Sequence, residues 1–325
     1  MLSLQARACL AEELLELMGR RRRPVPADAP PQPPITAFRE AEKRYRPRTN
    51  IPTDYSDVLD MRDGADAAIN AGTVRRAGRA YELAARPGLF VLPDAITPNV
   101  QRRLAHCCYS AYHRPPADTN LTWLARRDGL AAPPRTATPP QNLRWATLGH
   151  HYDWTNRCYA CDHAEPMPRH LATVCDGLCA AIGVAMTAEA AIVNYYRPGD
   201  TMGGHVDDAE VDKTRPLVSV SLGCSAVFLV GGATRDISPT ALWLRSGDAC
   251  IFTGAARSYY HGVPRILEGT CPPHLCAPAA WPDAPGEING SDGDYAAGRP
   301  AGALDGLCEF LRGARLNLNV REVGD

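Results

Sequence analysis

Two histidines and one aspartate are the residues whose types and spacing most clearly predict chemistry. His205-Val206-Asp207 places an imidazole and a carboxylate two positions apart, and His261 follows 56 residues after His205. On a β-strand, residues two apart project from the same face, so His205 and Asp207 could share one metal ion. Two histidines and one carboxylate on one face of an ion, with the other positions open, form the iron site of non-haem Fe(II) oxygenases. The spacing therefore predicts a candidate iron site.

Short patterns of this kind also arise by chance, because the chain has nine histidines. His151-Tyr152-Asp153 and His163-Ala164-Glu165 are further matches, and a lone His205 would more commonly be a hydrogen-bonded surface imidazole. The context favours His205. A turn at Arg197-Pro198-Gly199-Asp200 leads into it, alternating strands follow it, and His261 lies just after a further predicted strand.

The segment 315–321 alternates strictly between apolar and polar residues. One face carries leucine and valine, and the other carries Arg315, Asn317, Asn319 and Arg321. A solvent-exposed edge strand would alternate in the same way. In a small barrel, however, one face points inward, and an inward arginine requires an anion. 2-Oxoglutarate is a dianion whose far carboxylate could accept a bidentate guanidinium contact while its other end chelates iron.

Short strands and a few helices must position these residues. Apolar runs bounded by turn residues predict strands at 89–92, 143–148, 191–196, 217–222, 226–230, 249–252 and 314–323, and helical patterns lie at 97–112, 170–182 and 304–311. The stretches 114–140 and 268–300 have the composition of loops. Many short strands at turn-marked intervals predict a sandwich or a barrel with flanking helices.

The first 85 residues differ in character from the rest. Residues 4–18 predict a helix, residues 20–34 are rich in Arg and Pro and predict a linker, and residues 38–85 are polar and mostly helical in pattern. We therefore expect an N-terminal extension at 1–85 and a catalytic domain at 86–325. Ten basic and six acidic residues through residue 50 could favour a polyanion, although a solvated tail explains an arginine run more often.

Composition excludes several classes of protein. With 325 residues, 45% hydrophobic and 22% charged, the chain can bury a sizeable core, and no apolar run approaches the roughly 20 residues of a membrane helix. The net charge of −1 gives no global attraction to nucleic acid, so such a partner would need a local basic patch. Twelve cysteines without a secretory signal predict thiols in a reducing, intracellular compartment, with nucleus, cytoplasm and mitochondrion all open.

Several motifs together resemble the AlkB-type Fe(II)/2-oxoglutarate dioxygenases. The matching segments are Asn194-Tyr195-Tyr196, His205-Val206-Asp207, the strand at 218–223, Ser246-Gly247-Asp248, His261-Gly262 and the strand at 315–321. The segments 143–154 and 225–232, and the long insertion before Arg315, are similar to the first AlkB homologue subfamily of animals rather than to the bacterial repair enzyme. The resemblance extends over about residues 86–323.

This resemblance implies a fold and a set of residue roles. The fold is mainly β with flanking helices (α+β), with a double-stranded β-helix (jelly roll) core and an N-terminal helical extension. The resemblance implies that His205, Asp207 and His261 are the catalytic residues and bind Fe(II), with 2-oxoglutarate and O2 as co-substrates. It also implies 2-oxoglutarate contacts from Asn194, Tyr196, Arg315, Asn317 and Arg321, with Arg315 nearer the distal carboxylate, and substrate contacts from Trp145, His150, Tyr152 and Arg235.

The resemblance further implies oxidative demethylation of a methylated base in nucleic acid. We expect transfer RNA as the substrate, with N6-methyladenine in unpaired DNA as the alternative. We expect no membrane partner, and the sequence does not predict the oligomeric state. An enzyme that hydroxylates protein side chains remains a rival, which the lack of a basic rim around the iron would favour. A binding module without catalysis and a zinc hydrolase are disfavoured by the intact triad and the paired arginines.

Two cysteine groups could ligate zinc. Cys158, Cys161 and His163 form one group, and Cys271 and Cys276 with His274 form another. Each would need a further ligand, and buried unpaired cysteines are common, so we favour structural thiols.

Overall fold

The structure, a computed structural model, describes residues 34–46, 52–153, 156, 158–210, 212–281 and 303–324. The predicted helix at 4–18 and the arginine-rich linker up to residue 33 lie outside these residues, as does 282–302 of the predicted long loop. Thr36–Asp325 form one compact unit. Among the described helices, none is long and apolar enough to cross a membrane.

Two antiparallel sheets form the framework. The larger has the order β1-β2-β3-β12-β9-β14-β7-β5-β4, with β6 also pairing with β5, and the smaller has the order β11-β10-β13-β8. The strands of the larger sheet are β1 (Val74–Ala77), β2 (Ala80–Leu83), β3 (Leu89–Leu92), β4 (Asp118–Thr119), β5 (Trp145–Asp153), β6 (Cys158–Ala164), β7 (Ala190–Tyr196), β9 (Leu217–Gly223), β12 (Ala249–Phe252) and β14 (Arg315–Arg321). Those of the smaller sheet are β8 (Met202–His205), β10 (Ser225–Val230), β11 (Thr240–Leu244) and β13 (His261–Leu267).

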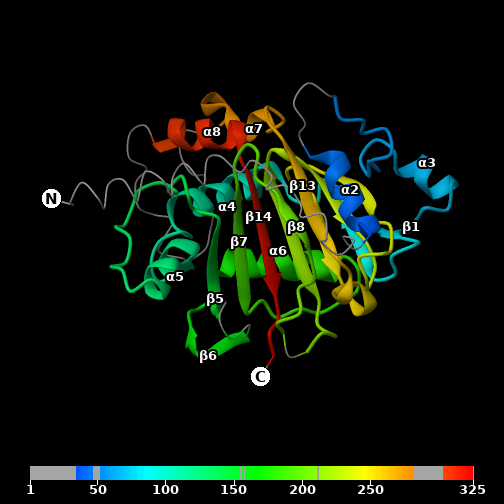
Figure 1. Cartoon of the computed structure of the whole chain (residues 1–325). Helices are drawn as coiled ribbons and strands as arrows, with labels where there is room; N and C mark the ends of the chain where they lie inside the picture. Colours follow the sequence, from blue (N-terminus) through cyan, green and yellow to red (C-terminus); the bar gives the residue numbers. More distant parts are fainter. Residues whose placement is uncertain are drawn as a thin grey trace, which may run out of the picture. The chain divides into compact units, whose positions relative to one another are not determined.

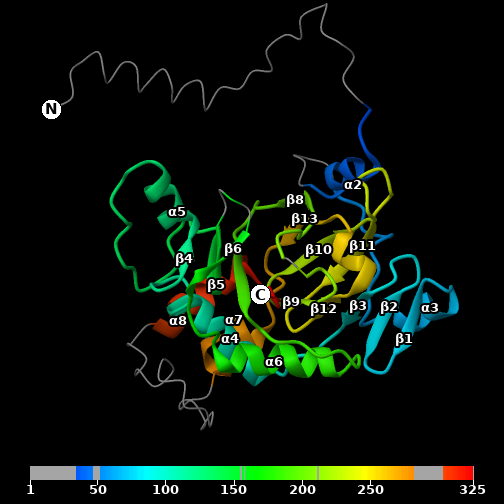
Figure 2. The ribbon, with the colours of Figure 1, turned by 90° about the horizontal axis from the view of Figure 1, so that it is seen from below.

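Helices cover the outer faces of both sheets (Figures 1 and 2). Helices α4 (Pro98–Ser110), α6 (Arg169–Ala180) and α8 (Ala303–Gly313) pack on β9, and α7 (Pro273–Cys276) contacts α4 and α8. Helix α2 (Ala37–Tyr45) packs on β8, β10 and β13 of the smaller sheet. The remaining short elements are α3 (Ala65–Asn70), α5 (Asn120–Arg127), η1 (Gly254–Ser258) and η2 (Pro278–Ala280).

The alternation of strand β14 explains how it serves both the core and the site. Its apolar residues Leu316, Leu318 and Val320 are fully buried in the core cluster that also contains residues of α4, α6 and α8. The other face points between the sheets, where Phe228 of β10 meets Phe252 of β12 with ring centroids 6.3 Å apart. The predicted mainly β architecture with helices outside is therefore confirmed.

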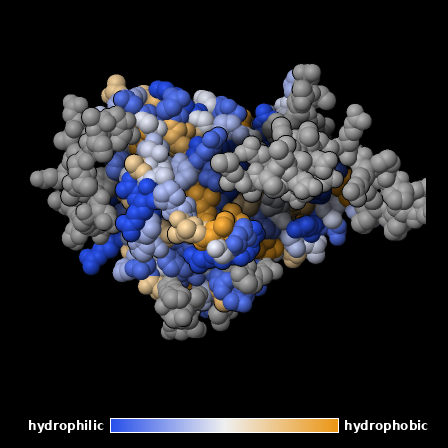
Figure 3. All heavy atoms as spheres, turned by 60° about the vertical axis from the view of Figure 1, so that its left-hand side comes forward, coloured by the Kyte–Doolittle hydropathy of each residue, from blue (hydrophilic) through white to orange (hydrophobic). Residues whose placement is uncertain are grey.

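The surface follows the same division. Of the described large apolar side chains, only Ile35, Leu130 and Ile237 are exposed. Hydrophilic residues predominate on the face drawn in Figure 3, where apolar atoms gather in one patch near its centre.

Several segments differ from the expectations, and α7 and η2 lie within the loop expected at 268–300. The stretch 38–85 was expected to be mostly helical, yet it contains the hairpin β1–β2, whose turn has Gly78 at φ +62°. Charged residues hide this strand pattern, and Arg75 and Glu82 pair across it with a 3.0 Å contact. The predicted loop at 114–140 contains α5, which begins at a capping box formed by Thr119 and Thr122.

The predicted domain boundary at residue 86 stays a prediction. Residues on both sides of it belong to the same compact unit, because β2 pairs with β3 across this position.

Candidate functional site

The smaller sheet brings the two histidines together. His205 ends β8 and His261 begins β13, and the two residues are direct partners in the antiparallel pairing of these strands. Their ring centroids lie 4.4 Å apart. Asp207 lies two residues beyond the end of β8, so the expectation that it shares a strand face with His205 was wrong. The irregular segment after the strand nevertheless places its carboxylate beside the histidines.

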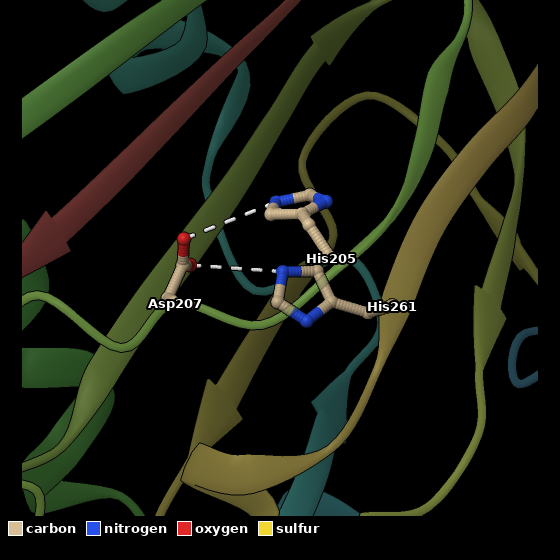
Figure 4. Close-up of side chains that lie close together, drawn as sticks. All are labelled: His205, Asp207 and His261. Carbon is tan, nitrogen blue, oxygen red and sulfur yellow. Dashed lines mark ion pairs between the residues drawn. The ribbon is translucent and has the colours of Figure 1, made fainter. Parts of the chain in front are cut away.

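The three side chains have the geometry of a metal site (Figure 4). Nε2 of His205 lies 3.9 Å from Oδ1 of Asp207, and Nε2 of His261 lies 3.6 Å from Oδ2. All three ligand atoms lie within 4.8 Å of one another. Among the described residues, these three form the one cluster of His, Cys, Asp or Glu side chains that could hold a metal ion. The donor set of two imidazoles and one carboxylate fits Fe(II).

Backbone carbonyls orient both histidine rings. Nδ1 of His205 lies 2.9 Å from the carbonyl oxygen of Gly203, and Nδ1 of His261 lies 3.1 Å from that of Tyr259. When Nδ1 donates to a carbonyl, Nε2 keeps its lone pair for a metal. The rings are therefore fixed in the orientation and tautomer that a metal ligand requires.

The electrostatic environment favours the ligand-competent forms of two of these residues. Burial raises the pKa of Asp207, but Arg321 and then the two histidines outweigh this effect and hold the pKa well below its usual value. Burial, followed by repulsion from His261, lowers the pKa of His205. At neutral pH the carboxylate is ionised and this imidazole is neutral, as metal binding requires.

Helix α2 and Arg235 hold the strand that carries His205. The backbone N–H of Gly204 donates to Oε1 of Glu42 at 2.6 Å, and its carbonyl accepts from Nη2 of Arg235 at 2.8 Å. A Cβ atom at Gly204 would lie 2.5 Å from the ring of Phe38, so glycine permits this close packing. Arg235 also lies over the ring of Tyr260. Its role as a base or phosphate contact stays a prediction.

Arg315 is the buried cation that the alternation of β14 predicts. It is 1% exposed, its Nη2 donates to Oγ of Ser221 at 3.0 Å, and its guanidinium lies 5.3 Å from the ring centre of Tyr196. Its Nε and Nη1 are buried, and neither has a hydrogen-bond partner in the described part of the chain. A buried guanidinium with unused donors is costly unless an anion binds it, so this position fits a carboxylate of 2-oxoglutarate.

Polar residues continue from Arg315 along the same face. Asn317 pairs with Asn194 of β7 in the sheet register, and its Nδ2 donates to Oγ of Ser219 at 2.8 Å. Oδ1 of Asn319 is buried, with no hydrogen-bond partner among the described residues. These side chains extend the polar face between Arg315 and Arg321. Contacts of Asn194, Tyr196 and Asn317 with 2-oxoglutarate stay predictions.

Arg321 occupies the other end of this face and contacts the triad. Its Nη2 lies 3.3 Å from Oδ2 of Asp207, its Nη1 donates to the hydroxyl of Tyr159 at 2.5 Å, and its Nε lies 3.1 Å from Oε1 of Glu210. The two arginines of β14 therefore have different surroundings. Arg321 is already paired with carboxylates, whereas Arg315 has donors left for an anion.

The predicted substrate aromatics lie on strand β5. Trp145 is partly buried and pairs with Asn194 in the sheet register, which places it beside the polar face. Nδ1 of His150 is buried and has no partner within the described residues. The ring of Tyr152 lies 5.2 Å from that of Tyr159 on the neighbouring strand β6. Roles of these residues in substrate binding stay predictions.

The competing metal patterns do not assemble in the part of the chain that the structure describes. Nδ1 of His151 lies 2.7 Å from Oγ1 of Thr147, and the carboxylate of Asp153 accepts from Asn156. The thiol of Cys276 donates to the carbonyl of Cys271. His274 contacts the side chain of Gln101. The side chains of Cys161 and His163 lie outside the described residues, so the zinc pattern at 158–163 stays untested.

Three residues near the site had no role in the sequence interpretation. Tyr159 contacts Arg321, while Glu210 and Arg257 form an ion pair of 2.8 Å in which both side chains are 1% exposed. Tyr159 lies between Cys158 and Cys161, which were considered as zinc ligands, whereas the tyrosine itself was not considered. Glu210 and Arg257 carry no local signal, because most such residues face solvent.

Comparisons with known proteins agree with this geometry. Residues 88–321 match the 2OG-Fe(II) oxygenase superfamily. The chain is 32% identical to the nucleic acid dioxygenase ALKBH1 of Mus musculus over 324 residues, covering 89% of this chain and 78% of the mouse protein. It is 34% identical to the tRNA demethylase abh1 of Schizosaccharomyces pombe, covering 73% of this chain and 87% of that protein.

A plant relative is similar over a comparable length. The DNA N(6)-methyladenine demethylase ALKBH1A of Arabidopsis thaliana is 29% identical to this chain, covering 89% of it and 96% of the plant protein. The family match, the triad and the buried arginine all indicate the same chemistry. The protein therefore uses Fe(II) as cofactor and 2-oxoglutarate and O2 as co-substrates. The chain therefore belongs to the 2OG-Fe(II) oxygenase superfamily and, within it, to the AlkB-type dioxygenases related to ALKBH1.

Proposed function

We propose that this protein oxidatively demethylates a methylated base in nucleic acid. The observation that carries the proposal is the juxtaposition of the His205–Asp207–His261 triad with the buried, incompletely paired Arg315 in a chain that is similar to nucleic acid demethylases. His205, Asp207 and His261 would hold Fe(II), and Arg315 would bind a carboxylate of 2-oxoglutarate.

The chemistry divides between the metal and the protein. Bound Fe(II), with 2-oxoglutarate and O2, supplies the oxidising power that hydroxylates a methyl group, with succinate and CO2 as co-products. A hydroxymethyl group on a base nitrogen then breaks down to the free base and formaldehyde. The protein side chains fix the ligands, hold the dianion and keep the triad carboxylate ionised through Arg321.

Transfer RNA is our preferred substrate. A base must leave its stack to reach a buried oxidant, and structured RNA presents loop bases that are already unstacked, so it lowers the cost that duplex DNA would impose. The similarity to the fission yeast tRNA demethylase supports this choice. The similarity to the plant DNA N(6)-methyladenine demethylase favours a second candidate, methyladenine in unpaired DNA.

One competition experiment tests both candidates. Methylated transfer RNA and methylated bubbled DNA are incubated together with the protein, Fe(II) and 2-oxoglutarate, and the modified nucleosides are measured by mass spectrometry. We expect faster loss of methyl groups from the RNA. Faster demethylation of the DNA would overturn the RNA preference, and loss from neither, with succinate still formed, would favour a protein substrate.

The compartment is a separate proposal. We propose that the protein works inside the cell, because the described cysteines are free thiols and most of them are buried. Fractionation of cells that express the full chain would test this, and recovery from the secreted fraction would contradict it.

A further inference from the structure

Four charged side chains lie together beside the triad, and we call them the buried charge network: Asp207, Glu210, Arg257 and Arg321. Arg257 donates from Nη2 to Oε2 of Glu210 at 2.8 Å. The second oxygen of Glu210 lies 3.1 Å from Nε of Arg321, and Nη2 of Arg321 lies 3.3 Å from Asp207. The network thus runs without a break from a buried ion pair to a metal ligand.

Stability alone does not account for this network. The side chains of Glu210 and Arg257 are each 1% exposed, and that of Arg321 is 3% exposed. Removing such charges from water costs several kcal/mol per ion, and well-packed apolar residues would often be as stable or more so. Its members come from the irregular segment after β8, from η1 and from β14. Three separate parts of the chain thus meet in a network that ends at one carboxylate of the triad.

The two carboxylates and two guanidinium groups balance in charge. Without Glu210, Arg257 would stay buried without its carboxylate, Arg321 would keep Asp207 as its remaining acidic contact, and a divalent cation would meet an excess of positive charge near the site. Oε1 of Glu210 forms an ion pair with Nε of Arg321 that lacks hydrogen-bond geometry, whereas Nη1 donates a hydrogen bond to Tyr159, so the guanidinium has contacts on two sides. These contacts limit how far Arg321 can move, and therefore how far it can pull Asp207 away from the histidines.

We propose that Glu210, anchored by Arg257, is a positioning residue for the metal site: it fixes Arg321 beside Asp207 and balances its charge. The proposal rests on the assignment of His205, Asp207 and His261 as metal ligands. Residues that orient and balance metal ligands typically change metal affinity by 10- to 100-fold when replaced.

Metal binding without turnover tests this role. Co(II) is titrated into the purified full chain and followed by its visible absorption. Glu210→Gln, which keeps the shape and removes the charge, should weaken Co(II) binding by about tenfold. The matched control is Asp248→Asn, because Asp248 is a buried acid paired with Arg62 at 2.7 Å, and its carboxylate partners Arg62, Asp94 and Arg245 belong neither to the triad nor to the buried charge network. This control should bind Co(II) like the wild type.

A double variant separates positioning from structural support. Glu210→Gln leaves Arg257 buried without its carboxylate, so the thermal midpoint should fall. Adding Arg257→Gln removes that unpaired charge and should recover part of the midpoint, but Arg321 still lacks its partner, so Co(II) binding should stay weak. If Co(II) affinity recovers together with stability, the role is structural and the proposal is wrong. The double variant decides the question even if the single variant fails to fold.

Two further results complete the test. Co(II) affinity of Glu210→Gln within twofold of the wild type would overturn the proposal while leaving the triad intact. If the wild type and Asp207→Ala bind Co(II) equally, the triad assignment itself fails, and the positioning role fails with it.

Discussion

Replacing Arg315 by alanine is the most direct test of the 2-oxoglutarate site. Arg315 is 1% exposed, and its Nε and Nη1 have no hydrogen-bond partner in the described part of the chain. A bound carboxylate would therefore form a buried ion pair with this side chain. Breaking such a pair on one side costs on the order of 3 kcal/mol, because the other charge stays buried and unpaired.

This magnitude sets the expected change in affinity. At about 1.4 kcal/mol for each factor of ten, the loss corresponds to roughly a 100-fold rise in the KM for 2-oxoglutarate. Succinate formation, measured over a range of 2-oxoglutarate concentrations at saturating Fe(II), gives this constant. Arg315→Lys should fall between the wild type and alanine, because it keeps the charge and loses the planar set of donors.

Two control variants identify the cause. Arg102→Ala removes a partly buried arginine that binds the carbonyls of His274 and Ala280, and it should leave the KM unchanged. Arg321→Ala should raise the KM less than Arg315→Ala does, since Arg321 is already paired with Asp207 and Glu210. A folded Arg315→Ala protein whose KM for 2-oxoglutarate stays within threefold of the wild type would refute the reasoning.

The remaining predictions concern the metal, the substrate and stability. Asp207→Ala should abolish succinate formation, whereas Asp153→Ala, in the competing pattern, should leave iron binding intact; turnover by the first variant would contradict the triad. Trp145→Ala should weaken the binding of methylated RNA by about 1–3 kcal/mol if the ring stacks on a base, and unchanged activity of this variant on both RNA and DNA substrates would remove that role. Asp60 accepts a hydrogen bond from Arg245, which lowers the pKa of Asp60 from 3.8 to about 2. The ionised Asp60 therefore stabilises the fold above pH 4, and this stabilisation is lost as the pH falls toward 2. Asp60→Asn should therefore be less stable than the wild type at pH 7, by a difference that shrinks in acid denaturation scans.

Periodicity predicted the faces of the strands better than their partners. The alternation in 315–321 correctly predicted which residues of β14 face the core and which share the polar face, because side chains in a strand alternate with a period of two. It could not show that Arg321 contacts the triad and that Arg315 contacts Ser221. That difference depends on the register of β14 against β7 and β9, which no local pattern contains.

The position of Asp207 shows a second limit. His205 and Asp207 were expected on one strand, but β8 ends at His205 and the carboxylate comes from the irregular segment that follows. The acidic residues that follow, Asp208 and Glu210, disfavour a continued strand. The pattern thus predicted the ligands through their types and spacing, while the strand geometry used to justify it was incorrect.

The catalytic unit also begins earlier than the family match indicates. The family match starts at residue 88, yet Glu42 of α2 accepts the N–H of Gly204, and Phe38 packs against the same glycine, one residue before His205. Glu42 is only 4% exposed and also binds Arg39, so its carboxylate is held on both sides. A buried carboxylate at this distance restrains the strand end that carries a metal ligand. The helix before the match is therefore part of the physical framework of the site.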